Sequence, residues 1–544
     1  MTGGEDPDRP GPDQDRSAAD EEWADEVAGD VRPGGRGSVA ENLLAALLGE
    51  PRTDEDGDDG DGDDGDGDGG DDDDRDDDGD DGEDRDDDGE DHSALLGPEV
   101  AEAGGPSAFA RAKQAILART PEHDLVPSLE RIAALLDLLG SPQQAYPVVH
   151  VTGTNGKTTT TRLIDAVLSE LGLRTGRFTS PHLSSITERI AMHGQPLDAA
   201  RFAAVYEEVA PFVDLVDSRN EIRMSFFEVL TAMAYAAFAD APVDAAVVEV
   251  GMGGTWDATN TAAGRVAVIT PIALDHVRFL GSTVAEVAAE KAGIIKPGAL
   301  VVIAEQPREA TEVLLSSAAR VGARVVREGV EFGVLERRLA IGGQLLRLQG
   351  LAGVYEEVFL PLHGEHQAHN AACALAAVEG LLGSGSRQID QGTVRAGFAN
   401  ATSPGRLEVL RTSPTVLVDA AHNPAGAAVT ARAVREEFTF SRLVGVVAVF
   451  ADKDVEGILT ALEPVLDEVL VTEAASERAM PAEELGELAE GIFGAARVRV
   501  VPRLQAALHE AVRRADAIGL PGAGVLVTGS ITTVAQARAL LGRG

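Results

Sequence analysis

The chain has 544 residues with 91 acidic and 46 basic side chains, a formal net charge of −45. Surfaces that bind nucleic acids are basic, so this balance argues against a nucleic-acid partner. The single cysteine, Cys373, excludes an intrachain disulfide and fits a reducing compartment. No run of about 18 apolar residues is present, and the N-terminus lacks the features of a secretory signal. We therefore expect a cytoplasmic protein with no membrane partner.

Most of the negative charge lies at one end of the chain. Residues 1–91 contain 39 acidic and 7 basic side chains, whereas residues 92–544 contain 52 acidic and 39 basic ones. Residues 51–91 are almost entirely Asp, Gly and Glu, a composition that buries too little apolar surface to offset the entropy of ordering. We expect residues 1–105 to form a disordered acidic tail that carries no catalytic chemistry.

From about residue 106 onward, short apolar segments alternate with longer Ala-rich helical patterns. Continuous apolar strands of this kind are typical of parallel sheets covered by helices on both faces. The turn-rich segment 401–406 separates two such series, which predicts an α/β fold with domains over residues 106–402 and 403–544. The expected strands are 148–151, 245–250, 266–270, 300–304, 415–418, 443–450, 468–472 and 524–528, and the expected helices are 159–171, 226–239, 284–292, 368–381 and 425–437.

A glycine-rich turn follows the first expected strand. Its glycines allow backbone N–H groups to face an anion, the helix N-terminus adds a partial positive charge, and a lysine reaches the distal phosphates. The eight-residue form of this loop needs glycine where this chain has Val151, so the loop is a variant two residues shorter. The pattern predicts mononucleotide binding without distinguishing a kinase, an ATPase or a ligase. The loop consists of Gly153, Thr154, Asn155, Gly156, Lys157, Thr158 and Thr159.

Polar side chains follow other expected strands. Glu249 ends a strand, and a carboxylate at this edge beside a phosphate loop is suited to holding magnesium. Asp275 and His276 follow the next strand, and a neutral histidine can ligate a metal or orient a phosphate. In the second domain, Arg406 can clamp a nucleotide and Asp419 can accept from ribose hydroxyls. Each of these is singly also compatible with an ordinary surface residue, but together they predict an active site in an interdomain cleft.

Taken in order, these segments resemble the folylpolyglutamate synthase/dihydrofolate synthase family of the Mur-ligase superfamily. The resemblance runs from about residue 125 to residue 538. It implies a P-loop ATPase-type domain followed by a smaller Rossmann-like domain. The motifs that carry it are GTNGKTTT (153–160), TSPHLSSITERI (179–190), SFFEVLTAMAY (225–235), EVGMGGTWDATN (249–260), LDHVRFLG (274–281), EKAGIIKPG (290–298), HGEHQAHNAACAL (363–375), SPGRLEVL (403–410), DAAHNPAG (419–426) and FADKD (450–454).

The resemblance also assigns roles to residues. It implies one magnesium ion on Ser180 and Glu249 and a second on His276. Lys291 matches the lysine that the family carbamylates, which turns an ammonium into a carboxylate-like group. The catalytic residues would be Lys157, Lys291, His276 and Glu249, and the phosphate loop would bind ATP with nucleotide contacts from Asn370, Arg406 and Asp419.

The substrate-binding residues implied by the resemblance fall into two groups. One is the stretch that contacts the pterin, and the other is a set of cleft residues in the second domain. One position departs from the family, because Thr255 stands where an arginine or lysine is common, which puts the affinity for pterin or glutamate in doubt. The two groups are Trp256, Asp257 and Ala258, and His422, Asp452 and Lys453.

The implied reaction is ATP-dependent amide formation by a monomer, in folate biosynthesis and polyglutamylation. L-Glutamate is joined to dihydropteroate, to the glutamate tail of a reduced folate, or to both, through an acyl phosphate. The sequence does not fix the balance between these two acceptors. Two alternatives are a cell-wall Mur ligase, which needs an additional N-terminal UDP-sugar domain, and a non-catalytic interaction protein that uses the acidic tail.

Overall fold

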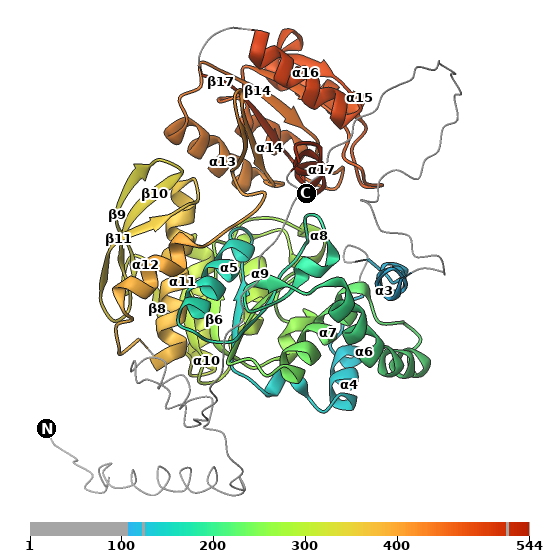
Figure 1. Ribbon diagram of the computed structural model, residues 1–544, viewed down its shortest axis with the longest axis vertical. Helices are drawn as coiled ribbons and strands as arrows, with labels where there is room; N and C mark the ends of the chain where they lie inside the picture. Colours follow the sequence, from blue (N-terminus) through green and yellow to red (C-terminus); the bar gives the residue numbers. More distant parts are fainter. Residues whose placement is uncertain (1–106, 122–125, 384, 518–521, 543–544) are drawn as a thin grey trace, which may run out of the picture. The chain divides into compact units, whose positions relative to one another are not determined.

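The computed structural model describes residues 107–121, 126–383, 385–517 and 522–542, which form three sheets. The acidic tail predicted for residues 1–105 lies outside them. We call the described part of residues 107–402 the first lobe and that of residues 403–542 the second lobe; Figure 1 labels their elements. Among the described residues, no helix combines the length and the apolar character that crossing a membrane requires.

The first lobe is built on an eight-stranded sheet in the order β4-β3-β2-β5-β1-β6-β7-β8. Six of its strands run parallel, and β3 and β4 form an antiparallel edge. β1 (VVHVT) is buried at every position, and three of its five residues are valine, as expected for a strand covered on both faces. The strands are β1 (Val148–Thr152), β2 (Thr175–Phe178), β3 (Ile190–Met192), β4 (Gln195–Pro196), β5 (Ala245–Glu249), β6 (Gly264–Ile269), β7 (Leu300–Ile303) and β8 (Arg324–Arg327).

Helices cover this sheet and supply its cores. One core cluster joins α7, α6 and α4 to strand residues such as Val148 and Val248, and another joins α9 and α10 to Ala267 and Val301. Helix α5 packs against α11, α12 and the sheet, and α11 also packs against β6 and β7 (Figure 1). The helices are α3 (Ala108–Leu117), α4 (Glu130–Leu138), α5 (Lys157–Glu170), α6 (Ala199–Arg219), α7 (Phe226–Asp240), α8 (Val277–Leu280), α9 (Val284–Lys291), α10 (Arg308–Arg320), α11 (Glu365–Gly383) and α12 (Gln391–Ala399).

A three-stranded antiparallel sheet, which the sequence did not predict, precedes α11. It consists of β9 (Gly333–Ala340), β10 (Gly343–Gln349) and β11 (Val354–Leu360). β9 is largely exposed and carries three consecutive charged residues, so it lacks the apolar run of the parallel strands. Cys373 lies in the following helix, α11, and its side chain is buried.

The second lobe contains a six-stranded sheet in the order β12-β13-β17-β14-β15-β16, parallel except for β12. Successive residues of β14 point to opposite faces: Leu443 and Val447 pack with α13, α14 and α15, whereas Val444 and Val446 pack with α16 and α17. The elements are β12 (Glu408–Thr412), β13 (Thr415–Asp419), α13 (Pro424–Glu437), β14 (Arg442–Val447), α14 (Val455–Leu462), β15 (Glu468–Val471), α15 (Ala482–Phe493), β16 (Val498–Val500), α16 (Leu504–Ala517), β17 (Ala523–Thr528) and α17 (Ile531–Leu540).

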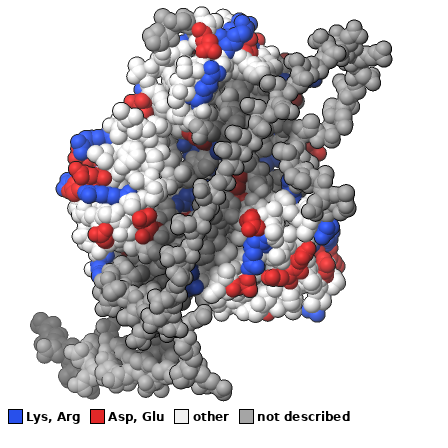
Figure 2. All heavy atoms as spheres, in the orientation of Figure 1, with Lys and Arg blue, Asp and Glu red and all other residues white. Residues whose placement is uncertain are grey.

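The predicted fold class is confirmed, because both large sheets are mostly parallel and are covered by helices. All eight expected strands and five expected helices are present, with ends that differ by a few residues. The largest differences, of three residues at one end, are α11, which begins at Glu365, and β14, which ends at Val447 although apolar residues continue to Phe450. On the face drawn in Figure 2, basic and acidic side chains of the described residues are interspersed with uncharged ones.

Candidate active site

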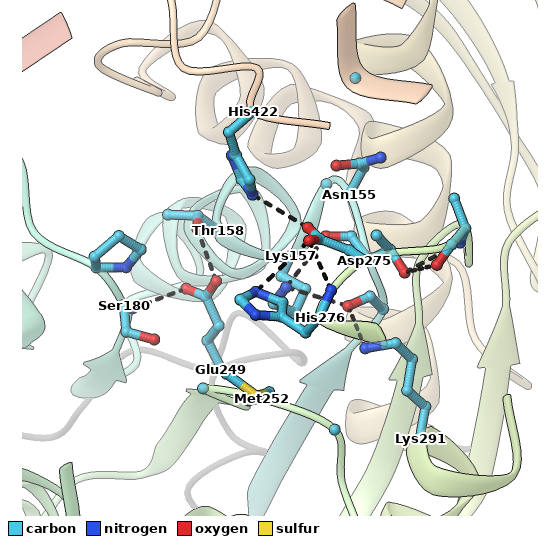
Figure 3. Close-up of a pocket in the computed structure, with 18 of the residues that line it drawn as sticks. Asn155, Lys157, Thr158, Ser180, Glu249, Met252, Asp275, His276, Lys291 and His422 are labelled. Carbon is cyan, nitrogen blue, oxygen red and sulfur yellow. Dashed lines mark hydrogen bonds and ion pairs between the residues drawn. The ribbon is translucent and has the colours of Figure 1, made fainter. Parts of the chain in front are cut away.

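A cavity of about 890 Å³ is lined by residues of both lobes. Its walls come largely from loops that follow the carboxyl ends of parallel strands, where α/β proteins bind ligands. The close-up in Figure 3 shows the phosphate loop, Glu249, Asp275 and His276 gathered around one space, with His422 reaching it from the second lobe.

Two glycines of the phosphate loop are favoured by its close packing and by its backbone conformation. A Cβ on Gly153 would lie 1.9 Å from Thr270 Oγ1, and one on Gly156 would lie 2.6 Å from Asn370 Oδ1. Both glycines also have positive φ, which favours a residue without a side chain. The loop therefore passes tightly between β6 and α11, and Asn370 is held against it.

Two lysines converge on the carbonyl of Gly153. Lys157 Nζ donates to Gly153 O at 3.1 Å and to Thr154 O at 3.2 Å, and Lys291 Nζ donates to Gly153 O at 2.8 Å. Burial lowers the pKa of Lys157, and burial together with the nearby charge of Lys157 lowers the pKa of Lys291 to about 7. Lys291 is thus a buried amine that is easily neutralised, rather than the exposed lysine that its helical position alone would indicate.

Glu249 lies beside the loop at the end of β5. Its carboxylate accepts from Thr158 Oγ1 at 2.7 Å and from the backbone N–H of Ser180 at 3.2 Å. Burial raises the pKa of Glu249 against the opposing effect of Lys157. One carboxylate and two hydroxyl side chains beside a phosphate loop form an oxygen-rich donor set that fits Mg²⁺, which completes its shell with water and phosphate oxygens. The described residues contain no group of three or more His, Cys, Asp or Glu that would hold a metal without such help.

Asp275 joins the two lobes. It lies in the first lobe, and it is contacted by Lys453 Nζ at 2.7 Å, Asn423 Nδ2 at 3.0 Å and His422 Nε2 at 3.3 Å from the second lobe. Burial alone would raise the pKa of Asp275, but the hydrogen bond from His422 and the positive groups around the carboxylate hold that pKa well below its usual range. The adjacent His276 is a neutral imidazole, because burial lowers its pKa to about 3.

In the second lobe, Asp419 organises the turn that carries Arg406. Its carboxylate accepts from Leu407 N at 2.7 Å, from Ala421 N at 2.9 Å and from Thr430 Oγ1 at 2.8 Å. Leu407 adopts a positive φ of 43°, an uncommon conformation for a branched side chain, which the bond to Asp419 helps to hold. Asp419 and Arg406 both line the cavity.

The predicted pterin-contacting stretch forms another part of the cavity wall. The carboxylate of Asp257 accepts from Met252 N at 2.9 Å, from Thr259 N at 3.0 Å and from Thr259 Oγ1. Burial raises the pKa of Asp257 to about 6. Thr255, at the position that departs from the family, donates through its hydroxyl to Glu290 O at 3.0 Å, so it ties this stretch to the end of α9.

The structure brings almost all of the predicted site residues together. Each lines the cavity except Asp452, which is paired with Arg478 at 2.7 Å and holds that cavity-lining arginine. Sequence reasoning missed Asn423 and Arg478, although both follow strands and could have been found by extending the strand-end rule. It also missed a buried ion pair at the cavity wall, in which Arg131 Nε donates to Glu228 Oε1 at 3.1 Å.

Comparison with known proteins identifies the family of the chain. A model of the Mur ligase middle domain matches residues 151–378, and a model of the Mur ligase, glutamate ligase domain matches residues 405–531. The chain is 53% identical over 448 residues to the dihydrofolate synthase/folylpolyglutamate synthase of Mycobacterium tuberculosis, covering 78% of this chain and 92% of that protein. It is 33% identical over 365 residues to the Bacillus subtilis protein of the same name, covering 67% of this chain and 85% of that protein.

Solved structures give the same result. The M. tuberculosis folylpolyglutamate synthase complexed with ADP and AMPPCP has a TM-score of 0.77 and 52% identity, over 80% of this chain and 99% of that chain. An Escherichia coli protein in complex with DHPP and ADP has a TM-score of 0.69 and 29% identity, over 80% of this chain and 99% of that chain.

The fold, the site and the two domain matches define an ATP-dependent acid–amino-acid ligase of the Mur type. More closely, the chain belongs to the dihydrofolate synthase/folylpolyglutamate synthase family, as its motifs indicated. This confirms the folate-ligase prediction over the cell-wall ligase and the non-catalytic interaction protein.

Proposed function

We propose that the cavity joins L-glutamate to dihydropteroate, to the glutamate tail of a reduced folate, or to both. The acceptor carboxylate attacks the γ-phosphoryl group of ATP, which forms an acyl phosphate and releases ADP. The amine of L-glutamate then attacks the acyl carbon, and inorganic phosphate leaves as the amide forms. The observation that carries this proposal is the convergence of the phosphate loop, Glu249 and His276 on one cavity that both lobes line.

The binding of ATP follows from the elements around the phosphate loop. The loop from Gly153 to Thr159 faces its backbone N–H groups and the start of α5 toward the phosphates, and Lys157 offsets the charge of the transferred group. Asn370 packs against the loop from α11, and Arg406 and Asp419 contact the nucleotide from the second lobe. In this view the domains are residues 106–402 and 403–544, and nucleotide binding draws on both.

Two magnesium ions complete the proposed site. Ser180 and Glu249 would hold one and His276 the other, and bound magnesium would supply positive charge to the phosphate oxygens. The oxygen-rich surroundings of Glu249 and the neutral state of His276 support this assignment. The protein's own part is to keep Ser180 and Glu249 buried beside the phosphate loop, where bulk water is largely excluded.

Lys291 is proposed to be N6-carbamylated. Carbamate formation needs a neutral amine, and the lowered pKa of about 7 leaves a large neutral fraction at physiological pH. The carbamate would place a negative group near Lys157, whereas the unmodified ammonium of Lys291 is repelled by the charge of Lys157. Its position, buried beside the phosphate loop, supports an electrostatic role.

The remaining roles concern the acceptor and glutamate. We assign Trp256, Asp257 and Ala258 to the pterin side, and His422, Lys453 and Asp452 to the glutamate side. Asp257 is already satisfied by three donors of its own loop, which supports a role in shaping the pocket as well as in contacting the pterin. Asp452 acts through Arg478, since it does not line the cavity.

The decisive experiment is product analysis with dihydropteroate and with a reduced folate, each with ATP, magnesium and L-glutamate. We expect ADP release that depends on both acceptor and glutamate, and the two rates give the balance between the activities. ADP release that needs neither acceptor would contradict the proposal.

Light scattering during size-exclusion chromatography checks the expected monomer. The same assays on a chain that lacks residues 1–100 should give an unchanged turnover number, and a large loss would show that the acidic tail takes part in catalysis.

A further inference from the structure

The wall of the cavity that the second lobe contributes carries three strong bases, Arg406, Lys453 and Arg478, and one acid, Asp419. The proposed nucleotide contact accounts for Arg406. Lys453, assigned above to the glutamate side, already has a partner, because it is bound to Asp275 across the lobe junction at 2.7 Å. Arg478 is therefore the base of this wall, among the described residues, to which neither the nucleotide nor the lobe junction gives a role.

Arg478 is held in one orientation from two sides. Its guanidinium carbon lies 4.6 Å from the centre of the Phe450 ring. Its Nη2 donates to the two carboxylate oxygens of Asp452 at 2.7 and 2.9 Å, and its Nε donates to Asp452 at 3.2 Å. Its third nitrogen, Nη1, makes no hydrogen bond with the described residues. The side chain is thus preorganised, and the two N–H donors of Nη1 are available to a ligand at the cavity wall.

The loop that carries Arg478 is fixed to the strand end that carries its partners. Ala451 N donates to Arg478 O at 2.9 Å, and Met480 N donates to Val449 O at 3.0 Å. Arg478 N donates to Ser476 Oγ at 3.2 Å, and Ser476 also lines the cavity. Backbone hydrogen bonds therefore join the loop of Arg478 to the strand end that carries Phe450 and Asp452, which reduces the entropy lost when Arg478 binds a ligand.

The reaction needs a site for a third substrate. The phosphate loop and the pterin-contacting stretch both belong to the first lobe, and the part of the second-lobe wall beyond the nucleotide contacts is the more basic surface left for L-glutamate. Glutamate carries two carboxylates, and a planar guanidinium is the side chain best matched to a carboxylate. Resting on the function proposed above, we propose that Arg478 binds a carboxylate of the incoming L-glutamate through Nη1, with Asp452 and Phe450 as positioning residues.

The test uses dihydropteroate as the acceptor, because it has no glutamate tail that would compete for Arg478. Initial rates of the full-length protein are measured as glutamate, ATP and dihydropteroate are varied in turn. For Arg478→Gln we expect the KM for glutamate to rise about 10- to 100-fold, the size of a lost charge-assisted hydrogen bond. The KM values for ATP and dihydropteroate should stay within about twofold, and kcat at saturating glutamate should be largely kept, which also shows that the variant folds.

Two further variants separate binding from positioning. Asp452→Asn keeps the shape of the side chain but weakens its ion pair with Arg478, so we expect a smaller rise in the KM for glutamate than in Arg478→Gln. The double variant should show no further rise beyond that of Arg478→Gln. Arg513→Gln is the matched control, because Arg513 is an exposed arginine of the same lobe that pairs with Glu510 and does not line this cavity. It should leave all three KM values unchanged.

The possible failures can be told apart. A wild-type protein that makes no glutamate-dependent product from either acceptor overturns both the proposed function and this subsite. An active wild type whose KM for glutamate is unchanged in Arg478→Gln overturns the subsite alone. An equal rise in the KM values for ATP and glutamate in that variant also overturns it, because Arg478 would then bind phosphate.

Discussion

The two lobes contribute opposite charge to the same cavity. Among the described lining residues, the first lobe supplies six acids and three bases, whereas the second supplies one acid and three bases. The acids of the first lobe include Glu249 and Asp275 at the reacting end, and its buried lysines have lowered pKa values. The single acid of the second lobe, Asp419, is occupied by donors of its own lobe.

This difference separates two tasks. The first lobe holds groups whose charge is costly in isolation, so they need phosphates, metals or a covalent modification to balance them. The second lobe offers cations on a framework that is already satisfied, so it is suited to receiving anionic substrates. A chain with a strongly negative net charge can therefore bind anionic ATP and glutamate, because the charge that matters is local.

The largest effect is expected from the first-lobe wall. Lys157→Ala removes the cation that faces the transferred phosphoryl group, and we expect kcat to fall about 10³-fold. Quench-flow measurement of ADP formation in a single turnover checks this. Lys113→Ala, in α3 and outside the cavity, should be neutral. A Lys157→Ala enzyme with most of its turnover would show that the first lobe is not the reacting wall.

The junction between the walls is tested by Asp275→Asn. This change keeps the shape but leaves Lys453 without its counter-charge in a buried position, so we expect kcat to fall about 30-fold as docking of the lobes weakens. Small-angle scattering with bound nucleotide should report a more open average state. Asp244→Asn breaks an ion pair within the first lobe and should change thermal stability without opening the protein. Equal opening in both variants would contradict a specific role for Asp275.

The second-lobe wall is tested by Arg406→Gln. Because Arg406 is assigned to the bound nucleotide, we expect the KM for ATP to rise about tenfold with a smaller change in kcat. Steady-state rates at varied ATP measure this. Arg411→Gln in β12 is the control, since Arg411 is exposed and outside the site cavity. An unchanged KM for ATP would remove the second lobe from nucleotide binding.

The smallest effect concerns pH and Lys291. With a pKa of about 7, a larger fraction of the amine is neutral at pH 7.5 than at pH 6.5. CO₂ is first removed and then restored to the same dissolved concentration at both pH values. Activity should then recover about threefold faster at pH 7.5 than at pH 6.5. Lys291→Met should show no response to CO₂. Recovery that is independent of both pH and CO₂ would argue against a carbamate.

Local sequence patterns predicted the parallel strands and the phosphate loop, because burial on both faces requires continuous apolar runs and the loop requires glycines at fixed positions. They did not predict β2, whose sequence TGRF includes an arginine, because that arginine is buried by pairing with Asp165, a partner 12 residues away. The same limit hid the orientation of Arg478, although its place after a strand could have been noticed. Its orientation depends on Phe450 and Asp452, which precede it by 26 residues or more and meet it only when the sheet forms.

The burial of Cys373 in α11 has a practical consequence. The chain contains one cysteine, it is 1% exposed, and burial raises the pKa of its thiol well above the usual range. A thiolate is the form that reacts with maleimides, so the folded protein behaves as a cysteine-free background. Fluorophores can be attached to one engineered cysteine in each lobe to follow their motion during turnover. If Cys373 becomes reactive, that reaction reports unfolding of the first lobe in the same protein.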